Sequence, residues 1–334
     1  MIQRRAFVLS LLASTAARGA SAQSRSMSDS VGRVVVVPGK LARVMPAGPP
    51  ASILLYFVAP ELSMGWVPGL QNESKPYVLP ASRELPALPR LTSRYQQIDA
   101  ETIKALRPDL IVDFGNVTQN YVTLADKVKS DTGIPTALID GKLEKVAASL
   151  KLAASMLGKR ERGEALANWA SKTLAMADES LAKAPADKRP RVYVARGSEG
   201  LQTGAKGSAL TEAVERAGAI NVAESKDRRP FDTTREQIAA WKPDLILAYD
   251  RSAYEAMRKA MPTTKVLLAP EYPWSWLGEP PSIQCLLGLH WLTGVFYRNE
   301  SKAELASATR EFHRLFYGVG PTNAQVDALL AHAT

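Results

Sequence analysis

The two stretches "ETIKALRPDLIV" (101–112) and "EQIAAWKPDLIL" (236–247) repeat one pattern at two places in the chain. In each, an amphipathic run ends at a basic residue followed by Pro-Asp, and a short apolar run follows at once. Proline cannot continue a helix, and a short apolar run behind it is typical of a buried strand. Each copy therefore predicts a helix, a proline stop and a strand, and two copies indicate two similar lobes rather than a solenoid of many repeats.

The segments around each copy extend this pattern into alternating helices and strands. Short apolar runs predict further strands at 33–37, 136–139, 191–195 and 265–268. Helical spacing of apolar residues predicts helices at 121–130, 208–217, 254–261 and from 286 onward. Such alternation is typical of the α/β class. We therefore expect two Rossmann-like lobes with mostly parallel sheets, an N-terminal lobe over 31–142 and a C-terminal lobe over 188–334.

The stretch between the two lobes has a different composition. Residues 143–184 are rich in Ala, Leu, Lys and Glu, with apolar residues at helical spacing such as Val146, Leu150 and Leu157. Pro185 closes the stretch. This pattern predicts one long helix, or two helices nearly in line, that links the lobes.

The first 22 residues have the features of a cleavable export signal. Arg4 and Arg5 precede a short apolar run, and Ala20-Ser21-Ala22 is a small-residue cleavage site. The order R-R-A-F-V-L also fits a twin-arginine signal, and a general secretory signal stays open. No cysteine follows the cleavage site, which argues against a lipid anchor. We expect a soluble, monomeric periplasmic protein that begins with a flexible polar lead-in at 23–30.

Composition and motifs argue against several classes of function. The net charge of +9 is spread among mixed charges with no aromatic residue inside a basic run, which argues against nucleic-acid binding. The single cysteine, Cys285, excludes an intramolecular disulfide. A glycine-rich stretch at 200–208 fails the phosphate-loop pattern, since Ala205 and Gly207 stand where glycine and a hydroxyl residue are needed. We expect no cofactor, no bound metal held by the protein alone, and no catalysis.

The two repeat copies, together with "RVYVARGSEGLQTGAKGSALTEAVERAGAINVA" (191–223), "PPSIQCLLGLHWL" (280–292) and "REFHRLFYGV" (310–319), carry a family resemblance. Over nearly the whole mature chain, it resembles the periplasmic binding proteins of ferric-siderophore, haem and cobalamin importers. The resemblance implies two α/β lobes joined by a long helix, with the ligand in the cleft between them. It also implies an ABC importer permease as direct partner and its ATPase as an indirect one.

Several side chains are candidates for ligand contacts. Arg196 directly follows the strand expected at 191–195, where its guanidinium could clamp a carboxylate or an oxyanion, or could serve a structural role. Tryptophans in Pro/Gly-rich loops could line a cleft or cap the core instead. The aromatic candidates are Trp66, Trp274 and Trp276, with Tyr56 and Tyr121 as weaker ones.

Glu101 and Glu236 occupy the same place in the two repeat copies. As acids in the first turn of a helix, they are favoured by the helix dipole alone. The resemblance implies a second role, in which one acid on each lobe docks against arginines of the permease.

The function expected from the resemblance is a receptor that delivers a metal chelate of siderophore, haem or cobalamin type to an importer. A receptor for a free oxyanion or metal ion is an alternative. An alternative of another class is a chelatase-like enzyme, which would require a histidine and an acid facing the cleft. The three histidines, His290, His313 and His332, lie near the C-terminus, outside the expected cleft loops.

Overall fold

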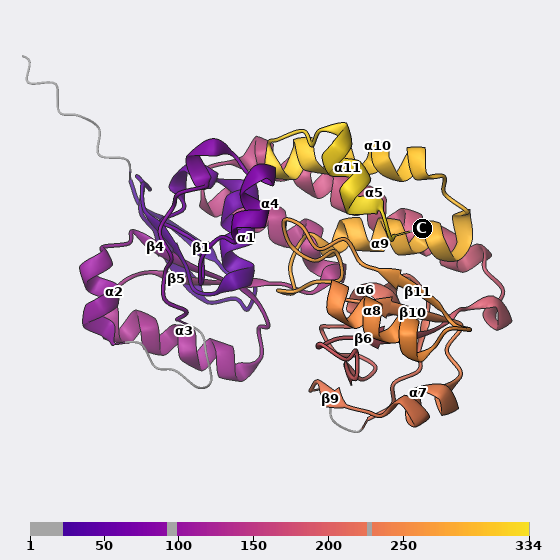
Figure 1. The fold of residues 1–334 in the computed structure, drawn as a ribbon. Coiled ribbons are helices and arrows are strands. Elements are labelled where there is room, and N and C mark those ends of the chain that lie inside the picture. The colour runs from indigo at the N-terminus through magenta and orange to yellow at the C-terminus, as the bar shows by residue number, and fades with distance from the viewer. Residues whose placement is uncertain (1–22, 92–98, 226–228, 334) are drawn as a thin grey trace, which may run out of the picture.

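The computed structural model describes residues 23–91, 99–225 and 229–333, which fold into two α/β lobes (Figure 1). The expected signal segment, 1–22, lies outside the described residues. In the part of the chain that the structure describes, no helix has both the length and the apolar character needed to cross a membrane.

The sheet of the N-terminal lobe has three parallel strands in the order β3-β4-β5. The strands are β3 (Val44–Pro46), β4 (Leu110–Gly115) and β5 (Thr136–Asp140). The helices are α1 (Pro49–Val58), α2 (Ala100–Leu106) and α3 (Gln119–Thr132), with short helical turns η1 (Pro60–Leu62), η2 (Asn72–Tyr77) and η3 (Pro80–Ser82) after α1. Every residue of α1 from Ala51 to Val58 is buried, so this helix forms the apolar centre of the lobe.

A separate hairpin precedes this sheet. Strand β1 (Arg25–Ser28) pairs antiparallel with β2 (Val34–Val37). Val35 and Val37 are buried, whereas Val34 and Val36 are 60% and 49% exposed. The strand expected at 33–37 is present as β2, but only one of its faces packs on the lobe, so it is half-buried. The lead-in that we expected to be flexible contains β1.

The sheet of the C-terminal lobe has four parallel strands in the order β11-β10-β6-β8. The strands are β6 (Arg191–Ala195), β8 (Ile220–Asn221), β10 (Leu245–Ala248) and β11 (Lys265–Leu268), and a small antiparallel pair is formed by β7 (Gln202–Thr203) and β9 (Phe231–Asp232). The helices around this sheet are α6 (Glu212–Arg216), α7 (Arg235–Trp241) and α8 (Arg251–Ala260), with a turn η5 (Ala186–Lys188) before β6. The mostly parallel sheets confirm the predicted fold class.

The repeated basic-Pro-Asp corner has the same backbone geometry in both lobes. Helices α2 and α7 end at Arg107 and Lys242, which both adopt a left-handed conformation with φ of 49° and 48°. The proline that follows each one cannot donate a helical hydrogen bond. The chain therefore leaves each helix in the same direction and enters β4 or β10.

In the N-terminal lobe, Asp109 and Arg43 close this corner. The Asp109 carboxylate accepts the backbone N–H groups of Ala42 and Arg43, both at 2.8 Å. The guanidinium of Arg43 donates to the Leu106 carbonyl at the end of α2, also at 2.8 Å. Free carbonyls at a helix end are thus paired with a cation from the segment that leads into β3.

In the C-terminal lobe, Asp244 and Arg191 repeat the arrangement. The Asp244 carboxylate accepts the backbone N–H of Arg191 at 2.8 Å. The Arg191 guanidinium donates to the Trp241 carbonyl at the end of α7, again at 2.8 Å. The sequence repeat is therefore a structural repeat down to individual hydrogen bonds.

The segment between the lobes forms two helices that pack against each other. After η4 (Leu143–Lys145) come α4 (Val146–Met156) and α5 (Arg160–Lys183), which contact each other extensively. Gly158, at φ 72°, lies in the turn between them. Gly163 of α5 approaches α4 so closely that an added Cβ would lie 2.2 Å from the Cβ of Ala154. The segment 143–184 thus forms two helices, the second of the two alternatives expected, but they pack side by side instead of lying in line, and α5 with 24 residues is the longer one.

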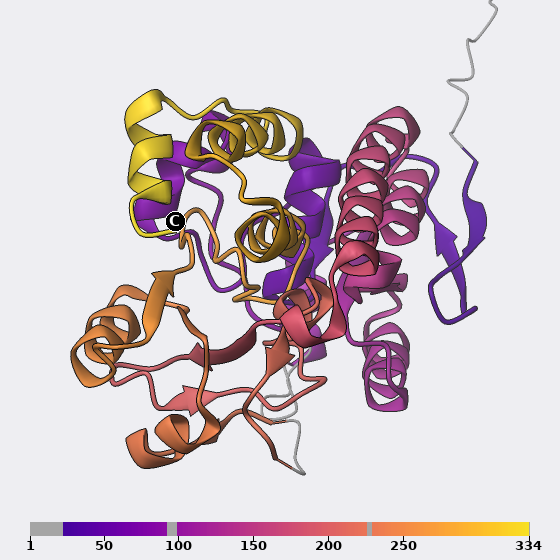
Figure 2. The same ribbon diagram turned by 90° about the vertical axis from the view of Figure 1, so that its right-hand side faces the viewer.

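The C-terminal helices return to the N-terminal lobe. They are α9 (Cys285–Thr293), η6 (Gly294–Arg298), α10 (Lys302–Phe312), η7 (His313–Tyr317) and α11 (Asn323–Leu330). The Tyr56 hydroxyl of α1 donates to the Tyr317 carbonyl at 2.5 Å, and the rings of Phe57 and Phe316 lie 5.3 Å apart. Figure 2 shows these yellow helices beside the purple segment of the N-terminal lobe. One buried cluster therefore includes residues of both lobes.

His313 is buried in this inter-lobe packing. It is 1% exposed, and neither ring nitrogen has a hydrogen-bond partner among the described residues. Its ring lies 4.6 Å from that of Tyr317 and 5.7 Å from that of Tyr77. Burial lowers the pKa of His313 from 6.5 to about 3, because the charged imidazolium would lose its hydration.

We predict that His313→Phe weakens the pH dependence of stability. The unfolded chain takes up a proton near pH 6.5 and the folded chain only near pH 3, so this group lowers the free energy of unfolding as pH falls between those values. The loss approaches about 1.4 kcal/mol per pH unit. Urea unfolding at pH 7 and pH 4 measures it, with the pH 7 comparison isolating any packing defect of the variant. Equal pH slopes for wild type and variant would contradict the assignment.

Candidate functional site

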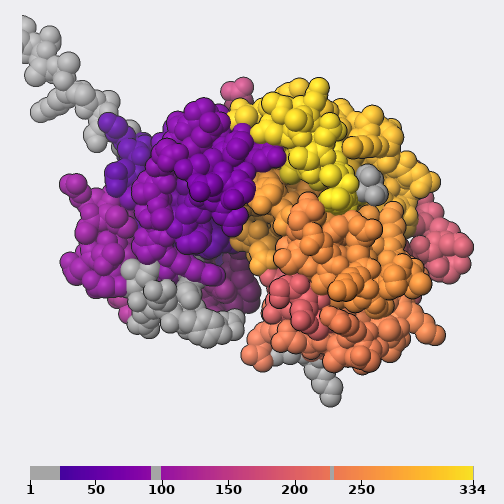
Figure 3. All heavy atoms as spheres, viewed as in Figure 1, coloured from indigo at the N-terminus to yellow at the C-terminus, as the bar shows by residue number. Residues whose placement is uncertain are grey.

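A cavity of about 600 Å³ lies between the two lobes. The N-terminal lobe contributes the start of α1 and residues 66–69 and 71, and the C-terminal lobe contributes residues 249–250 after β10 and residues 271–275 and 279–281 after β11. Figure 3 shows a notch in the surface between the lobes. Open α/β sheets bind ligands beyond the carboxyl ends of their strands, and this cavity lies beyond such ends of both sheets.

Two of the predicted tryptophans, Trp66 and Trp274, line the cavity. Their ring centroids are 5.4 Å apart although they come from opposite lobes. Trp66 is anchored by its indole N–H, which donates to the Ser82 carbonyl at 2.8 Å. Trp274 stacks on Tyr317 at 5.7 Å. The two rings, tilted 44° to each other, supply a rigid apolar surface inside the cavity.

Proline is the most frequent lining residue. Prolines lie in both walls, at 49, 50, 68, 273, 280 and 281. Proline has no backbone N–H, so these positions offer no backbone donor to a ligand. Pro49 and Pro50 are the first two residues of α1, which removes two of the free N–H groups that a helix start would otherwise offer to an anion.

The charged lining residues are divided between the lobes. Arg90 belongs to the N-terminal lobe, and Asp250, Glu271 and Glu279 belong to the C-terminal lobe. Burial is the main cause that raises the pKa of Glu271, and the negative charge of Asp250 adds to it. The C-terminal wall is therefore rich in carboxylate oxygens in a partly desolvated place.

Arg196 stands behind this wall rather than in it. Its guanidinium donates to Glu279 at 2.5 Å and to the Gln202 side chain at 3.0 Å, and it lies 5.2 Å from the ring centroid of Tyr249. The side chain is 13% exposed. Two of its side-chain nitrogens are thus engaged by Glu279 and Gln202, and Arg196 is not among the residues that line the cavity.

The other aromatic candidates lie outside the lining of this cavity. Tyr56 is 2% exposed, and its hydroxyl accepts the Leu79 N–H at 2.9 Å in addition to its bond with Tyr317. Trp276 is 1% exposed and packs edge-on against Trp291. Tyr121 lies in the first turn of α3. Tyr56 belongs to the core because it lies within the buried helix α1, and Trp276 because the loop after β11 packs on α9.

Sequence reasoning missed the polar residues of the C-terminal wall. Tyr249 and Asp250 directly follow the strand expected at 244–248, at its carboxyl end, so the signal was present. Burial raises the pKa of Tyr249 well above its usual value, and its hydroxyl lies 2.5 Å from the Leu210 carbonyl. Glu271 and Glu279 lie in the loop that was singled out only for its tryptophans.

Glu101 and Glu236 lie in the first turns of α2 and α7, one on each lobe. Both side chains are exposed. Glu101 forms an ion pair with Lys104 at 2.9 Å. Hydrogen bonds from its own backbone N–H and from the Thr234 hydroxyl lower the pKa of Glu236. Both acids are therefore accessible to a partner.

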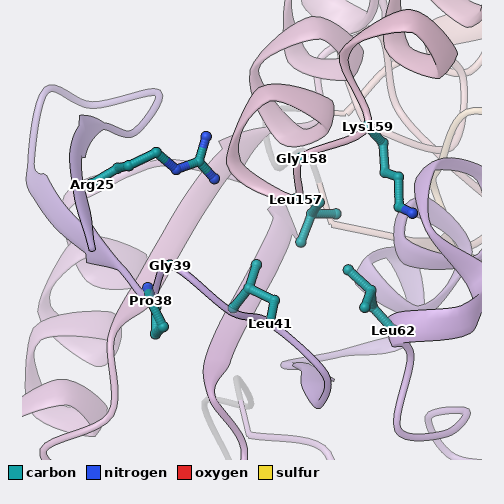
Figure 4. Close-up of a pocket in the computed structure, with 8 residues that line it drawn as sticks. All are labelled: Arg25, Pro38, Gly39, Leu41, Leu62, Leu157, Gly158 and Lys159. Carbon is teal, nitrogen blue, oxygen red and sulfur yellow. The ribbon is translucent and has the colours of Figure 1, made fainter. Parts of the chain in front are cut away.

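A second, smaller cavity of about 150 Å³ lies between the N-terminal hairpin and the α4–α5 turn (Figure 4). Its two cations are already engaged. Arg25 donates to the carbonyls of Ser155 and Met156 at 3.3 and 3.0 Å, and Lys159 pairs with Glu61. This cavity is the gap left by a helix end capped by an arginine, and it is not a candidate ligand site.

Within residues 23–91, 99–225 and 229–333, no three His, Cys, Asp or Glu side chains gather as a metal site. His290 donates or accepts a bond with Glu300 at 2.9 Å, away from the cavity lining. The cavity between the lobes thus offers flat apolar walls, carboxylates and one arginine to a ligand.

We predict that Arg196→Met loosens the 271–281 wall. Losing the charged bonds to Glu279 and Gln202 should lower the free energy of unfolding by roughly 1–2 kcal/mol and speed amide exchange within 271–281. Arg216→Met is the matched control, because Arg216 pairs with the exposed Asp178 at 2.5 Å and is not a lining residue of the cavity; its loss should cost less than about 1 kcal/mol. Unchanged exchange in Arg196→Met would show that Arg196 does not position the loop.

Comparison with known proteins finds a matching family and several relatives of this chain. A family model described as periplasmic binding protein matches residues 65–272, more than half of the chain. The molybdate-binding protein MolA of Haemophilus influenzae is 26% identical over 261 residues, with 68% of this chain and 72% of that protein covered.

Solved structures share the fold across most of the chain. A solute-binding protein of an ABC transporter from Sulfurospirillum deleyianum matches with a TM-score of 0.82 and 24% identity, over 92% of this chain and 99% of that one. MolA bound to molybdate matches at 0.66 and 20%, over 89% and 99%. A periplasmic haem-binding protein from Pseudomonas aeruginosa matches at 0.55 and 22%, over 78% and 94%. Together with the two-lobed fold and its cavity, the family match shows that this chain belongs to the periplasmic binding proteins, the solute receptors of ABC importers.

Proposed function

We propose that this receptor binds a metal chelate of siderophore, haem or cobalamin type and delivers it to an ABC importer. The observation that carries the proposal is the cavity of about 600 Å³ with tryptophan and proline walls. Pockets of this size and character enclose organic ligands, which contact the walls through flat apolar surfaces. The metal belongs to the chelate and is cargo, held by the chelator's own donor atoms.

A free oxyanion is the second candidate, favoured by the similarity to the molybdate-binding protein MolA. Two features of the cavity argue against it. A tetrahedral oxyanion is only a few times larger than a water molecule, which takes about 30 Å³ in the liquid, so most of the cavity would stay unfilled. Pro49 and Pro50 remove N–H donors at the start of α1, and Asp250 and Glu271, the two lining carboxylates without an ion pair among the described residues, repel an anion.

The same cavity supports a receptor rather than a chelatase-like enzyme. Metal insertion or removal requires a base that accepts protons from the chelator, and histidine is the usual one. The described lining residues include no histidine. The export signal expected at 1–22 agrees with a receptor that acts in the periplasm.

We predict that protein isolated from the periplasm of its own host carries a bound metal chelate. Native mass spectrometry should show a chain that begins at Gln23 with a chelate bound, and the chelate mass should be unchanged after incubation. Calorimetry on the emptied protein with a ferric hydroxamate, haemin, cobalamin and molybdate then ranks the classes. Tight binding of molybdate with no binding of any chelate would replace the first candidate by the second.

We also predict that Glu101→Ala, Glu236→Ala protein binds ligand normally but fails to support import. One exposed acid on each lobe suits a permease built from two similar halves. Charges at such an interface mainly set how fast the receptor associates with the permease and in which orientation it docks. Both acids lie outside the cavity lining, so affinity should stay within a few-fold. The assay is uptake by vesicles that contain the reconstituted importer.

The control for this variant is Glu84→Ala. Glu84 is also an exposed acid, paired with Lys75 at 2.9 Å, but it lies outside the repeat. Its loss should leave uptake unchanged. Wild-type uptake by the double variant would mean that the two acids serve only their helix starts.

A further inference from the structure

The two walls of the ligand cavity differ in charge. Arg90 lies on the side of the N-terminal lobe, whereas all three described carboxylates of the lining, Asp250, Glu271 and Glu279, lie on the side of the C-terminal lobe. A ligand held between the walls therefore meets an uneven electrostatic field, and its own charge distribution decides how well it fits.

Of the three carboxylates, Glu279 is already neutralised. Its ion pair with Arg196 is 2.5 Å long, and the Arg196 side chain is mostly buried behind the wall. Glu279 therefore offers little net charge to a ligand.

Asp250 and Glu271 differ from it, because neither is in an ion pair within the described chain. Asp250 uses Oδ1 to cap α8, accepting the Ala253 N–H at 2.9 Å. Glu271 accepts the backbone N–H of Arg251. The Arg251 guanidinium is directed elsewhere, 3.4 Å from Nε2 of His332. Two partly buried carboxylates thus share one wall of the cavity without a cationic side chain bound to either.

We propose that Asp250 and Glu271 bind a positively charged group of the ligand, so that the chelate carried by this receptor is a cation with a protonated amine or an equivalent group. The inference rests on the proposed function, because it concerns the same cavity and its cargo. Two carboxylates near each other repel, and a cation placed between them removes that repulsion and restores the interactions lost on burial. The apolar walls would hold the body of the chelate, and the carboxylates would set its orientation.

The raised pKa of Glu271 agrees with a binding site for a cation. Its pKa is raised by burial and by Asp250, and lowered by the Arg251 N–H and charge. The other ionisable groups around it are Tyr272, which also lines the cavity, and Glu73, whose charge acts on Tyr272. A bound cation would favour the ionised form of Glu271, so binding releases a proton, and the affinity for a cationic ligand rises with pH as Glu271 loses its proton.

The test uses three ferric chelates that differ only in the charge of one end. Ferrioxamine B has a free ammonium group, its N-acetyl derivative is neutral there, and its N-succinyl derivative carries a carboxylate. We expect wild-type protein to bind ferrioxamine B about 10-fold or more tightly than the acetylated form, and the succinylated form most weakly, by titration of tryptophan fluorescence. The affinity for ferrioxamine B should rise with pH, and that for the acetylated form should not.

Substitutions of the two carboxylates test whether they cause the preference for ferrioxamine B. Glu271→Gln and Asp250→Asn should each reduce the ratio between ferrioxamine B and its acetylated form, and the double variant should abolish it. Asparagine caps a helix as well as aspartate does, so α8 keeps its start. The control is Glu255→Gln, an exposed carboxylate of α8 outside the cavity lining, which should keep the wild-type ratio.

The outcomes separate this inference from the function it rests on. Equal binding of all three chelates, or a preference that survives in the double variant, overturns the charge assignment and leaves the chelate receptor standing. If the protein binds none of the three and binds molybdate, the chelate proposal fails and this inference fails with it.

Discussion

In each lobe, the aspartate of the basic-Pro-Asp corner fixes the start of the neighbouring strand. Asp109 and Asp244 each accept backbone N–H groups at the start of the neighbouring strand, and the arginine at that start caps the helix before the corner. A charged acceptor bound to backbone donors is among the stronger hydrogen bonds in proteins. These bonds set where β4 and β10 begin relative to their neighbours. The carboxyl ends of both sheets, and with them the cavity walls, follow from that register.

The position of one lobe relative to the other depends on segments that contact both. The loop after β11 belongs to the C-terminal lobe, yet Trp274 packs on Trp66, Tyr56 and Tyr317. The Ser74 hydroxyl of η2 donates to the Pro273 carbonyl at 2.6 Å. Before α4, a further hydrogen bond joins the lobes, in which the Leu143 N–H donates to the side chain of Glu212 in α6 at 2.9 Å. The cavity between the lobes is thus shaped by contacts within the chain itself, and a site formed in advance costs less entropy when it binds a ligand.

Much of the fold could be predicted from local sequence, and the site only in part. The proline corners and the apolar runs behind them indicated β4 and β10 because both signals are local. The α4–α5 reversal at Gly158 was missed, since a glycine inside a helical pattern does not reveal how closely two helices will pack, and Gly163 matters only once Ala154 lies opposite. Trp66, Trp274 and Trp276 were expected from their loop positions either to line a cleft or to cap the core; the first two line the cavity, whereas Trp276 is buried because its loop packs on α9. Tyr56 is buried because it lies within α1. The carboxylates of Asp250 and Glu271 come together only through the parallel pairing of β10 with β11.

The buried cluster that includes residues of both lobes has a consequence for folding. Val112 of the N-terminal sheet, Leu150 of α4, Val194 and Leu247 of the C-terminal sheet, and Trp291 of α9 all belong to that cluster. Neither lobe encloses its apolar surface alone, so a cut in the chain between them would expose surface on both pieces to water. In shape the molecule has two lobes, but the cluster that they share predicts that they unfold as one cooperative unit, with full stability only when the last helices have joined the first.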